Sequence, residues 1–109
     1  MTVETKIFDN DDGRHCLTIM DASEQSYEIF DEHELQGGGY TWEGIVHALI
    51  RTNMPEAAQN LDIGAEADNA YVYSASEAPL ATLQKLILKA DGDSEFLRFA
   101  IANADENLE

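Results

Sequence analysis

Apolar residues in this chain repeat with two different periods, and this change of period constrains the fold more than any other feature. Residues 3–8 and 15–20 are rich in apolar and β-branched side chains, which is typical of strands. The polar stretch 10–13, with the sequence NDDG, predicts a hairpin turn between them. A third apolar run at 27–30 predicts one more strand, which would extend the hairpin into a meander.

The period changes to that of a helix after the loop at 36–39. Thr41 occupies the position of an N-cap residue, whose hydroxyl would accept a hydrogen bond from a free amide of the first turn. Pro55 is expected to end this helix or to open a short second one. The apolar face of the helix falls at i, i+3, i+4, i+7 and i+8: Trp42, Ile45, Val46, Leu49 and Ile50.

The second half of the chain predicts a hairpin followed by two helices. Residues 61–65 and 70–74 have the composition of strands, with turn residues between them. A helical stripe over 80–87 is followed by an Asp-Gly pair that would stop the helix. A last helix is expected over 94–104, with residues 105–109 frayed.

These elements follow the order β-β-β-α-β-β-α-α within one domain, residues 1–109. We predict an α+β fold with a mainly antiparallel sheet of about five strands and helices packed on one face. The chain has neither a run of about 20 apolar residues nor a basic leader, so we expect a cytoplasmic protein without a membrane span. Cys16, the only cysteine, lies on a predicted strand and is expected to pack there rather than to act as a nucleophile.

The chain is strongly acidic, with 22 Asp and Glu against 6 Lys and Arg and a formal net charge of -16. Such a charge repels polyanions and attracts basic proteins, which argues against direct nucleic-acid binding and favours a basic protein partner. Residues 1–34 carry ten of the acids and two of the bases, and they predict the most electronegative face. Solubility or adaptation to high salt is the alternative explanation of the charge.

None of the patterns that signal catalysis or metal binding is complete in this chain. The segment 9–13 begins like a calcium loop, but its glycine is at the fifth position and Met20 stands at the twelfth. The cluster 31–34 combines three carboxylates with His33, yet no second histidine is near in sequence. The glycines at 37–39 lack the lysine of a phosphate-binding loop, and no serine lies in a G-x-S-x-G context. We therefore predict no catalytic residue, no metal, no cofactor and no enzymatic activity.

Four large amphipathic side chains could serve either as binding anchors or as packing residues. Packing is the favoured role, because the tryptophan begins the apolar stripe of its helix and two of the tyrosines alternate along a strand. The four residues are Tyr40, Trp42, Tyr71 and Tyr73.

The glycine-rich segment and the helix after it resemble the bacterial family called immunity protein 51. In that family a Gly-x-Gly-Tyr-x-Trp segment leads a helix, and a proline and a hairpin with an aromatic strand follow. Gly38 departs from the pattern, since a polar residue is expected there, as does Ala65, where a proline is expected; residues 1–26 show no match. The residues that carry the resemblance, which spans 27–104, are Gly37, Gly39, Tyr40, Trp42, Pro55, Glu66, Ala67, Tyr71, Tyr73 and Ser74.

The resemblance implies a cytoplasmic immunity protein that binds the C-terminal domain of a polymorphic or contact-dependent toxin and neutralises it. Because a nuclease cleft must be basic to hold phosphates, the charge favours a one-to-one complex with a basic nuclease, with no membrane or small-molecule substrate involved. A second hypothesis is a regulator that mimics nucleic acid and occupies a DNA- or RNA-binding protein. The predicted toxin-binding residues are Asp11, Asp12, Glu28, Asp31, Glu32 and Glu34.

Overall fold

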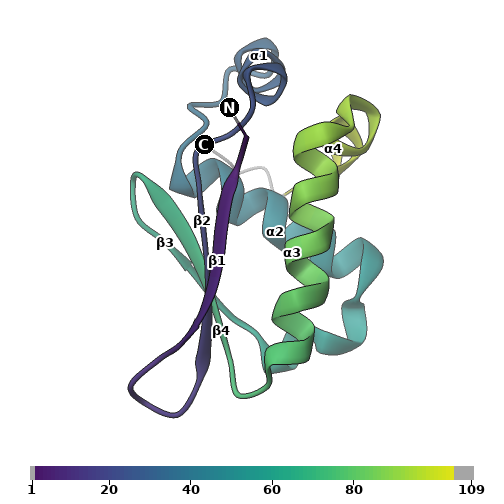
Figure 1. Ribbon diagram of the computed structural model, residues 1–109. Coiled ribbons are helices and arrows are strands. Elements are labelled where there is room, and N and C mark those ends of the chain that lie inside the picture. The colour runs from purple at the N-terminus through teal and green to yellow at the C-terminus, as the bar shows by residue number, and fades with distance from the viewer. Residues whose placement is uncertain (1, 105–109) are drawn as a thin grey trace.

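A computed structural model describes residues 2–104, in which helices lie on one side of a four-stranded sheet (Figure 1). In chain order the elements are β1 (Glu4–Asp9), β2 (His15–Met20), α1 (Glu24–Glu32), α2 (Gly39–Asn53), the 3-10 helix η1 (Pro55–Asn60), β3 (Asp62–Ala65), β4 (Asn69–Ser74), α3 (Glu77–Gly92) and α4 (Ser94–Ala102).

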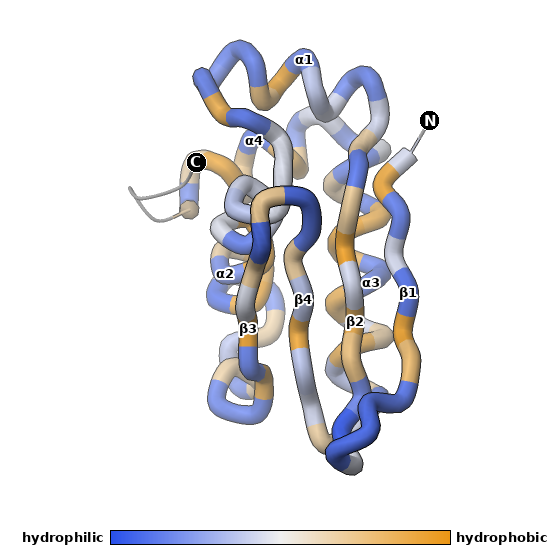
Figure 2. The backbone as a smooth tube through the Cα atoms, turned by 90° about the vertical axis from the view of Figure 1, so that its left-hand side faces the viewer, coloured by the Kyte–Doolittle hydropathy of each residue, from blue (hydrophilic) through white to orange (hydrophobic). Residues whose placement is uncertain are grey.

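The sheet has the strand order β1-β2-β4-β3, and every neighbouring pair is antiparallel. One row across it joins Ile7, Leu17, Val72 and Ile63, which all belong to the core or pack against it. Since side chains alternate along a strand, the adjacent residues point to the opposite face. Figure 2 shows that face toward the viewer, with α2 and α3 behind the sheet. The prediction that helices cover one face of an antiparallel sheet is therefore confirmed.

Helix α2 supplies the centre of the core, and the predicted apolar stripe is confirmed. All five stripe residues are buried, and Trp42 is completely inaccessible. Pro55 opens η1 directly after α2, as one of the two predicted outcomes for this proline. Helix α3 adds the buried side chains of Leu80, Leu83 and Ile87 to the same core.

The prediction of a strand at 27–30 is wrong, because this segment lies in α1 and the sheet has four strands instead of five. Ser23 caps α1 by accepting a hydrogen bond from the Ser26 amide (3.1 Å). The buried residues Ser26, Ile29 and Phe30 are spaced i, i+3 and i+4, which is a helical period. The segment is too short for the sequence alone to distinguish this period from the pattern of a strand.

Two further expectations need correction. Gly38, not Thr41, is the N-cap residue of α2; Thr41 lies inside the first turn, where its hydroxyl accepts a hydrogen bond from the Gly37 amide (3.0 Å). Tyr71 and Tyr73 do not pack in the core, because the buried Val72 between them faces the helices and the two rings lie on the opposite face of the sheet. There the rings contact each other edge to face, with centroids 5.6 Å apart.

The second half of the chain otherwise follows the prediction. Helix α3 runs through Gly92, so the Asp-Gly pair lies in its last turn, and Asp93 caps α4 by accepting from the amides of Glu95 and Phe96 (3.1 and 3.2 Å). Cys16 is buried as expected, and this burial raises the pKa of its thiol, which keeps it protonated and unreactive. The predicted fraying of 105–109 concerns residues outside the described range.

Candidate binding surface

Four of the six predicted toxin-binding residues lie together at one end of the molecule. Glu28, Asp31 and Glu32 are exposed on α1, and Glu34 is exposed in the loop that leads to α2. Figure 1 shows α1 at the top of the molecule, beyond the ends of the strands. These carboxylates therefore belong to a single surface.

The glycines before α2 bring a second acidic segment, the β3–β4 turn, against the same end. The Gly39 amide donates a hydrogen bond to the Ala67 carbonyl (2.9 Å). A Cβ atom on Gly39 would overlap the carbonyl oxygens of Glu66 and Asn69, so only glycine allows this approach. The exposed side chains of Glu66 and Asp68 are thereby held beside the start of α2.

We call this surface the acidic end, and its charge is largely uncompensated. The sequence has seven acids and no lysine or arginine from residue 15 to residue 50. Within the described residues, the ion pair at this surface joins Arg98 to Glu32 (3.0 Å), and both side chains are about half exposed, so the pair neutralises little. The acidic end is formed by Glu28, Asp31, Glu32, Glu34, Glu66 and Asp68.

Two exposed tyrosines flank these carboxylates. Tyr27 on α1 is 37% exposed and Tyr40 in the first turn of α2 is 47% exposed. Gly37 has a positive φ of 85°, and a Cβ atom there would approach the Tyr27 ring to 3.0 Å, so the ring packs directly over the glycine. The Tyr27 ring also meets Phe30 edge to face, with centroids 6.1 Å apart. Tyr27 therefore combines a fixed ring with an exposed edge.

A buried carboxylate fastens α1 to the rest of the fold. Asp91, at the end of α3, is only 5% exposed. Its Oδ2 accepts from the Val3 amide (2.9 Å), and its Oδ1 accepts from the Ser23 amide and the Ser26 hydroxyl (2.8 and 2.7 Å). Hydrogen bonds to an ionised acceptor are stronger than neutral ones, so this contact positions the acidic helix firmly.

Trp42 provides a second contact that fixes the loop before α1. Its indole N–H donates to the Asp21 carbonyl (2.9 Å), and Asp21 has a positive φ of 62°. The Trp42 ring also meets Phe30 of α1 edge to face, with centroids 5.8 Å apart. The Gly-x-Gly-Tyr-x-Trp segment thus joins α1, α2 and the β3–β4 turn at one place.

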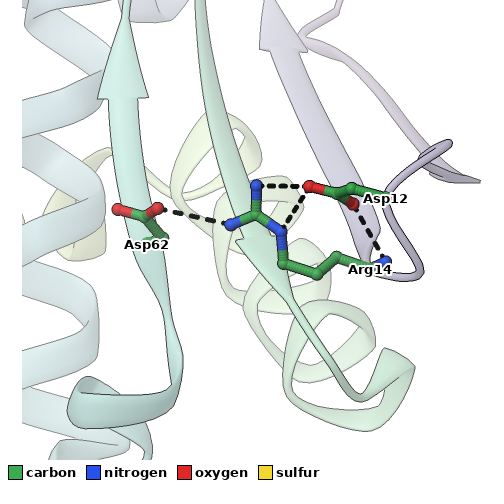
Figure 3. Close-up of polar contacts among 3 residues, drawn as sticks. All are labelled: Asp12, Arg14 and Asp62. Carbon is green, nitrogen blue, oxygen red and sulfur yellow. Dashed lines mark hydrogen bonds and ion pairs between the residues drawn. The ribbon is translucent and has the colours of Figure 1, made fainter.

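The other two predicted binding residues, Asp11 and Asp12, lie far from the acidic end. They belong to the β1–β2 turn, at the opposite end of the molecule in Figure 1. Arg14 is paired with Asp12 (2.6 Å) and with Asp62 of β3 (3.4 Å), as Figure 3 shows. Hydrogen bonds from Arg14 lower the pKa of Asp12 to about 2. The six predicted residues therefore form two separate groups.

Sequence reasoning missed part of the acidic end. Glu66 and Asp68 are more than 30 positions from α1, and nothing local links them to it. The consecutive glycines before α2 were a usable signal, because they indicate a close backbone approach without naming the partner. Tyr40 was predicted to pack, whereas nearly half of its surface is exposed.

The described residues contain no group of three or more His, Cys, Asp or Glu side chains that could hold a metal ion. Among residues 2–104, no helix combines the length and the apolarity that crossing a membrane requires.

The described residues thus form a small α+β fold whose acidic end carries six exposed carboxylates and one exposed ion pair. The family model of immunity protein 51 matches residues 5–106, and the chain belongs to this family. The match includes the first hairpin, where the sequence patterns gave no resemblance. The family is one of immunity proteins rather than enzymes, and it implies a toxin as partner. No curated protein and no solved structure matches the chain.

Proposed function

We propose that this protein neutralises a basic toxin domain, a nuclease, by binding it one-to-one through the acidic end in the cytoplasm. The observation that supports this proposal is the negative charge of the acidic end. This surface combines the acids of residues 28–34 with those of the β3–β4 turn and has one exposed ion pair. No chemistry by the immunity protein is required, because occupation of the toxin suffices.

The physical basis is complementarity to a cleft that holds phosphates. Such a cleft is lined by lysine and arginine, and an opposing acidic surface steers the two proteins together and raises the association rate. Carboxylates on the rim of the complex would act mainly on this rate, whereas desolvated pairs at its centre would slow dissociation.

The exposed tyrosines supply apolar contact area, which the carboxylates do not. Tyrosine offers a large apolar area with few rotatable bonds and is enriched among residues that dominate binding energy. Tyr27 is held by Gly37 and Phe30, so little side-chain entropy would be lost when a partner covers it. We propose Tyr27 and Tyr40 as the apolar contacts among the acids.

The test uses the toxin domain encoded beside this gene. The two purified proteins are mixed and their complex is weighed by light scattering, and the nuclease activity of the toxin is measured with rising amounts of the immunity protein. We expect a one-to-one complex and complete inhibition at equimolar amounts. A toxin domain that is not basic or has no nuclease activity would contradict the proposal. Inhibition without a stable complex would contradict it as well.

A further inference from the structure

Strand β1 is an uncovered edge of the sheet. In Figure 2 it borders the sheet, and no element of residues 2–104 lies on its outer side. It contains no proline, and all six of its residues pair in continuous register with β2, so its outer backbone groups are left as a regular row. Such a row is a template on which another strand can pair.

The charges on β1 are complementary to those of the same strand in reverse. Glu4 and Lys6 are both exposed and point to the open face of the sheet, with Thr5 between them. In an antiparallel pair of two β1 strands centred on Thr5, Glu4 of each copy stands directly opposite Lys6 of the other. A pairing moved by one residue in each strand would instead place Lys6 against Lys6, which is repulsive.

We propose that β1 pairs antiparallel with β1 of a second copy around a two-fold axis at Thr5, so that the two sheets become one continuous sheet. The two Glu4–Lys6 contacts set the register. Because the axis relates the same patch on both chains, the interface closes on itself and gives a dimer instead of a fibre.

Apolar side chains on the open face support this register. Phe8 of the second copy would lie opposite Thr2, next to a hollow of about 530 Å³ on this face of β1 and β2. Phe8 is 38% exposed and Met20, which lines the hollow, is 37% exposed. In this register Phe8 of each copy would lie beside β1 of the other copy, which would cover part of its exposed surface.

The helix side of the same edge is suited to contact as well. Helix α3 runs beneath β1, because Gln84 donates a hydrogen bond to the Thr5 hydroxyl (2.9 Å). One turn further along α3, Leu88 is 47% exposed. Lys6 and the two lysines of α3 place three of the six basic residues of the chain on these two elements, which reduces the repulsion between two chains of charge -16 along this edge.

The proposal is tested by exchanging the two charges. Sedimentation equilibrium on the full chain at fixed salt, up to about 1 mM protein, gives the dimer dissociation constant for the wild type, Glu4→Lys, Lys6→Glu and the double exchange Glu4→Lys/Lys6→Glu. We expect each single variant to raise the constant about tenfold, since two attractive contacts become repulsive. The double exchange should return it to within about threefold of the wild type.

A variant distant from β1 distinguishes the effect of the Glu4–Lys6 contacts from an effect of total charge. Glu56→Lys in η1 changes the total charge as Glu4→Lys does and should not weaken the dimer. Melting curves identify any variant that fails to fold. A wild type that stays monomeric over the whole range, or a double exchange that dimerises no better than the single variants, would overturn the proposal. The experiment needs no toxin, so its result is independent of the proposed function.

Discussion

The two ends of this molecule are both acidic, yet their charges differ in availability. At the β1–β2 turn, Asp12 is held by Arg14, which also contacts Asp62 and stacks on the Tyr73 ring at 4.6 Å. At the acidic end, the ion pair that residues 2–104 form is the exposed one between Arg98 and Glu32. Counting acids along the sequence therefore overestimates the turn as a binding site, because the fold neutralises part of its charge.

The two ends also differ in how they are held. The turn is a hairpin loop whose Asp12 carboxylate accepts from the backbone amide and the side chain of Arg14, its neighbour two positions on. The acidic end is assembled from segments far apart in sequence, through the glycines, Trp42 and Asp91. Its geometry should consequently depend on a few buried contacts, and the following changes test that dependence.

The largest effect is expected at Trp42. Truncation to alanine should cost about 3–5 kcal/mol of folding free energy, because a fully buried aromatic side chain is lost. Trp42→Phe keeps a ring but loses the hydrogen bond to the Asp21 carbonyl, and it should cost less, about 1–2 kcal/mol. Urea denaturation measures both. A Trp42→Ala protein with normal stability but lost toxin binding would place this residue in the interface instead.

The next largest effect is expected at Gly39. Gly39→Ala should cost about 3 kcal/mol, because the added Cβ overlaps the backbone of the β3–β4 turn and the turn must move away. Gly92→Ala is the matched control: a Cβ there meets nothing within 4 Å, and the substitution should be neutral or stabilising by about 0.5 kcal/mol. Equal stability of the two variants would show that the acidic end does not rest on this close approach.

Removing the charge of Asp91 should have an intermediate effect. Asp91→Asn replaces one accepting oxygen by an NH₂ group, which then faces a donor, either the Val3 amide or the groups of Ser23 and Ser26. We expect a loss of about 2 kcal/mol and faster amide hydrogen exchange in α1 than in α2. Uniform exchange in both helices would mean that Asp91 stabilises the whole domain and does not specifically hold α1.

The smallest effect is expected at Asp12, whose side chain is 43% exposed. Its folded pKa of about 2 lies below 3.8, the ordinary value for an aspartate, so its ion pair with Arg14 contributes above pH 3.8 and is lost as the pH falls toward 2. Asp12→Asn should therefore leave the melting temperature at pH 7 almost unchanged and flatten its decrease at acid pH slightly. A large loss of stability at pH 7 would contradict this view of the turn as a surface ion pair.

The sequence predicted α2, α3 and α4 as helices and missed α1. The stripe of α2 has five apolar residues over about two and a half turns of a 15-residue helix, so its helical period is unambiguous. Helix α1 has nine residues, and its run at 27–30 fits a strand as well as a helix. Ser23 is the local signal that would have favoured the helix, since serine is among the preferred N-cap residues.

The candidate site could be predicted only in part, for a related reason. The acids of α1 and the following loop are close in sequence, so they were predicted as one group although the segment 27–30 was wrongly predicted as a strand. The β3–β4 turn joins them through contacts of Gly39 that depend on the topology of the whole sheet. Arg14 likewise reaches across β4 to Asp62, a contact that no local pattern contains.

The most direct test of the account is the association rate of the cognate toxin domain across a salt series. The two variants to compare are Asp31→Asn/Glu32→Gln/Glu34→Gln at the acidic end and Asp11→Asn/Asp12→Asn at the turn. We expect the wild-type rate to approach about 10⁸ M⁻¹s⁻¹ at low salt and to fall as salt is added. The triple variant should be slower by about tenfold and the turn variant by less than about twofold. A salt-independent rate, or a turn variant as slow as the triple variant, would contradict the claim that the acidic end binds the toxin.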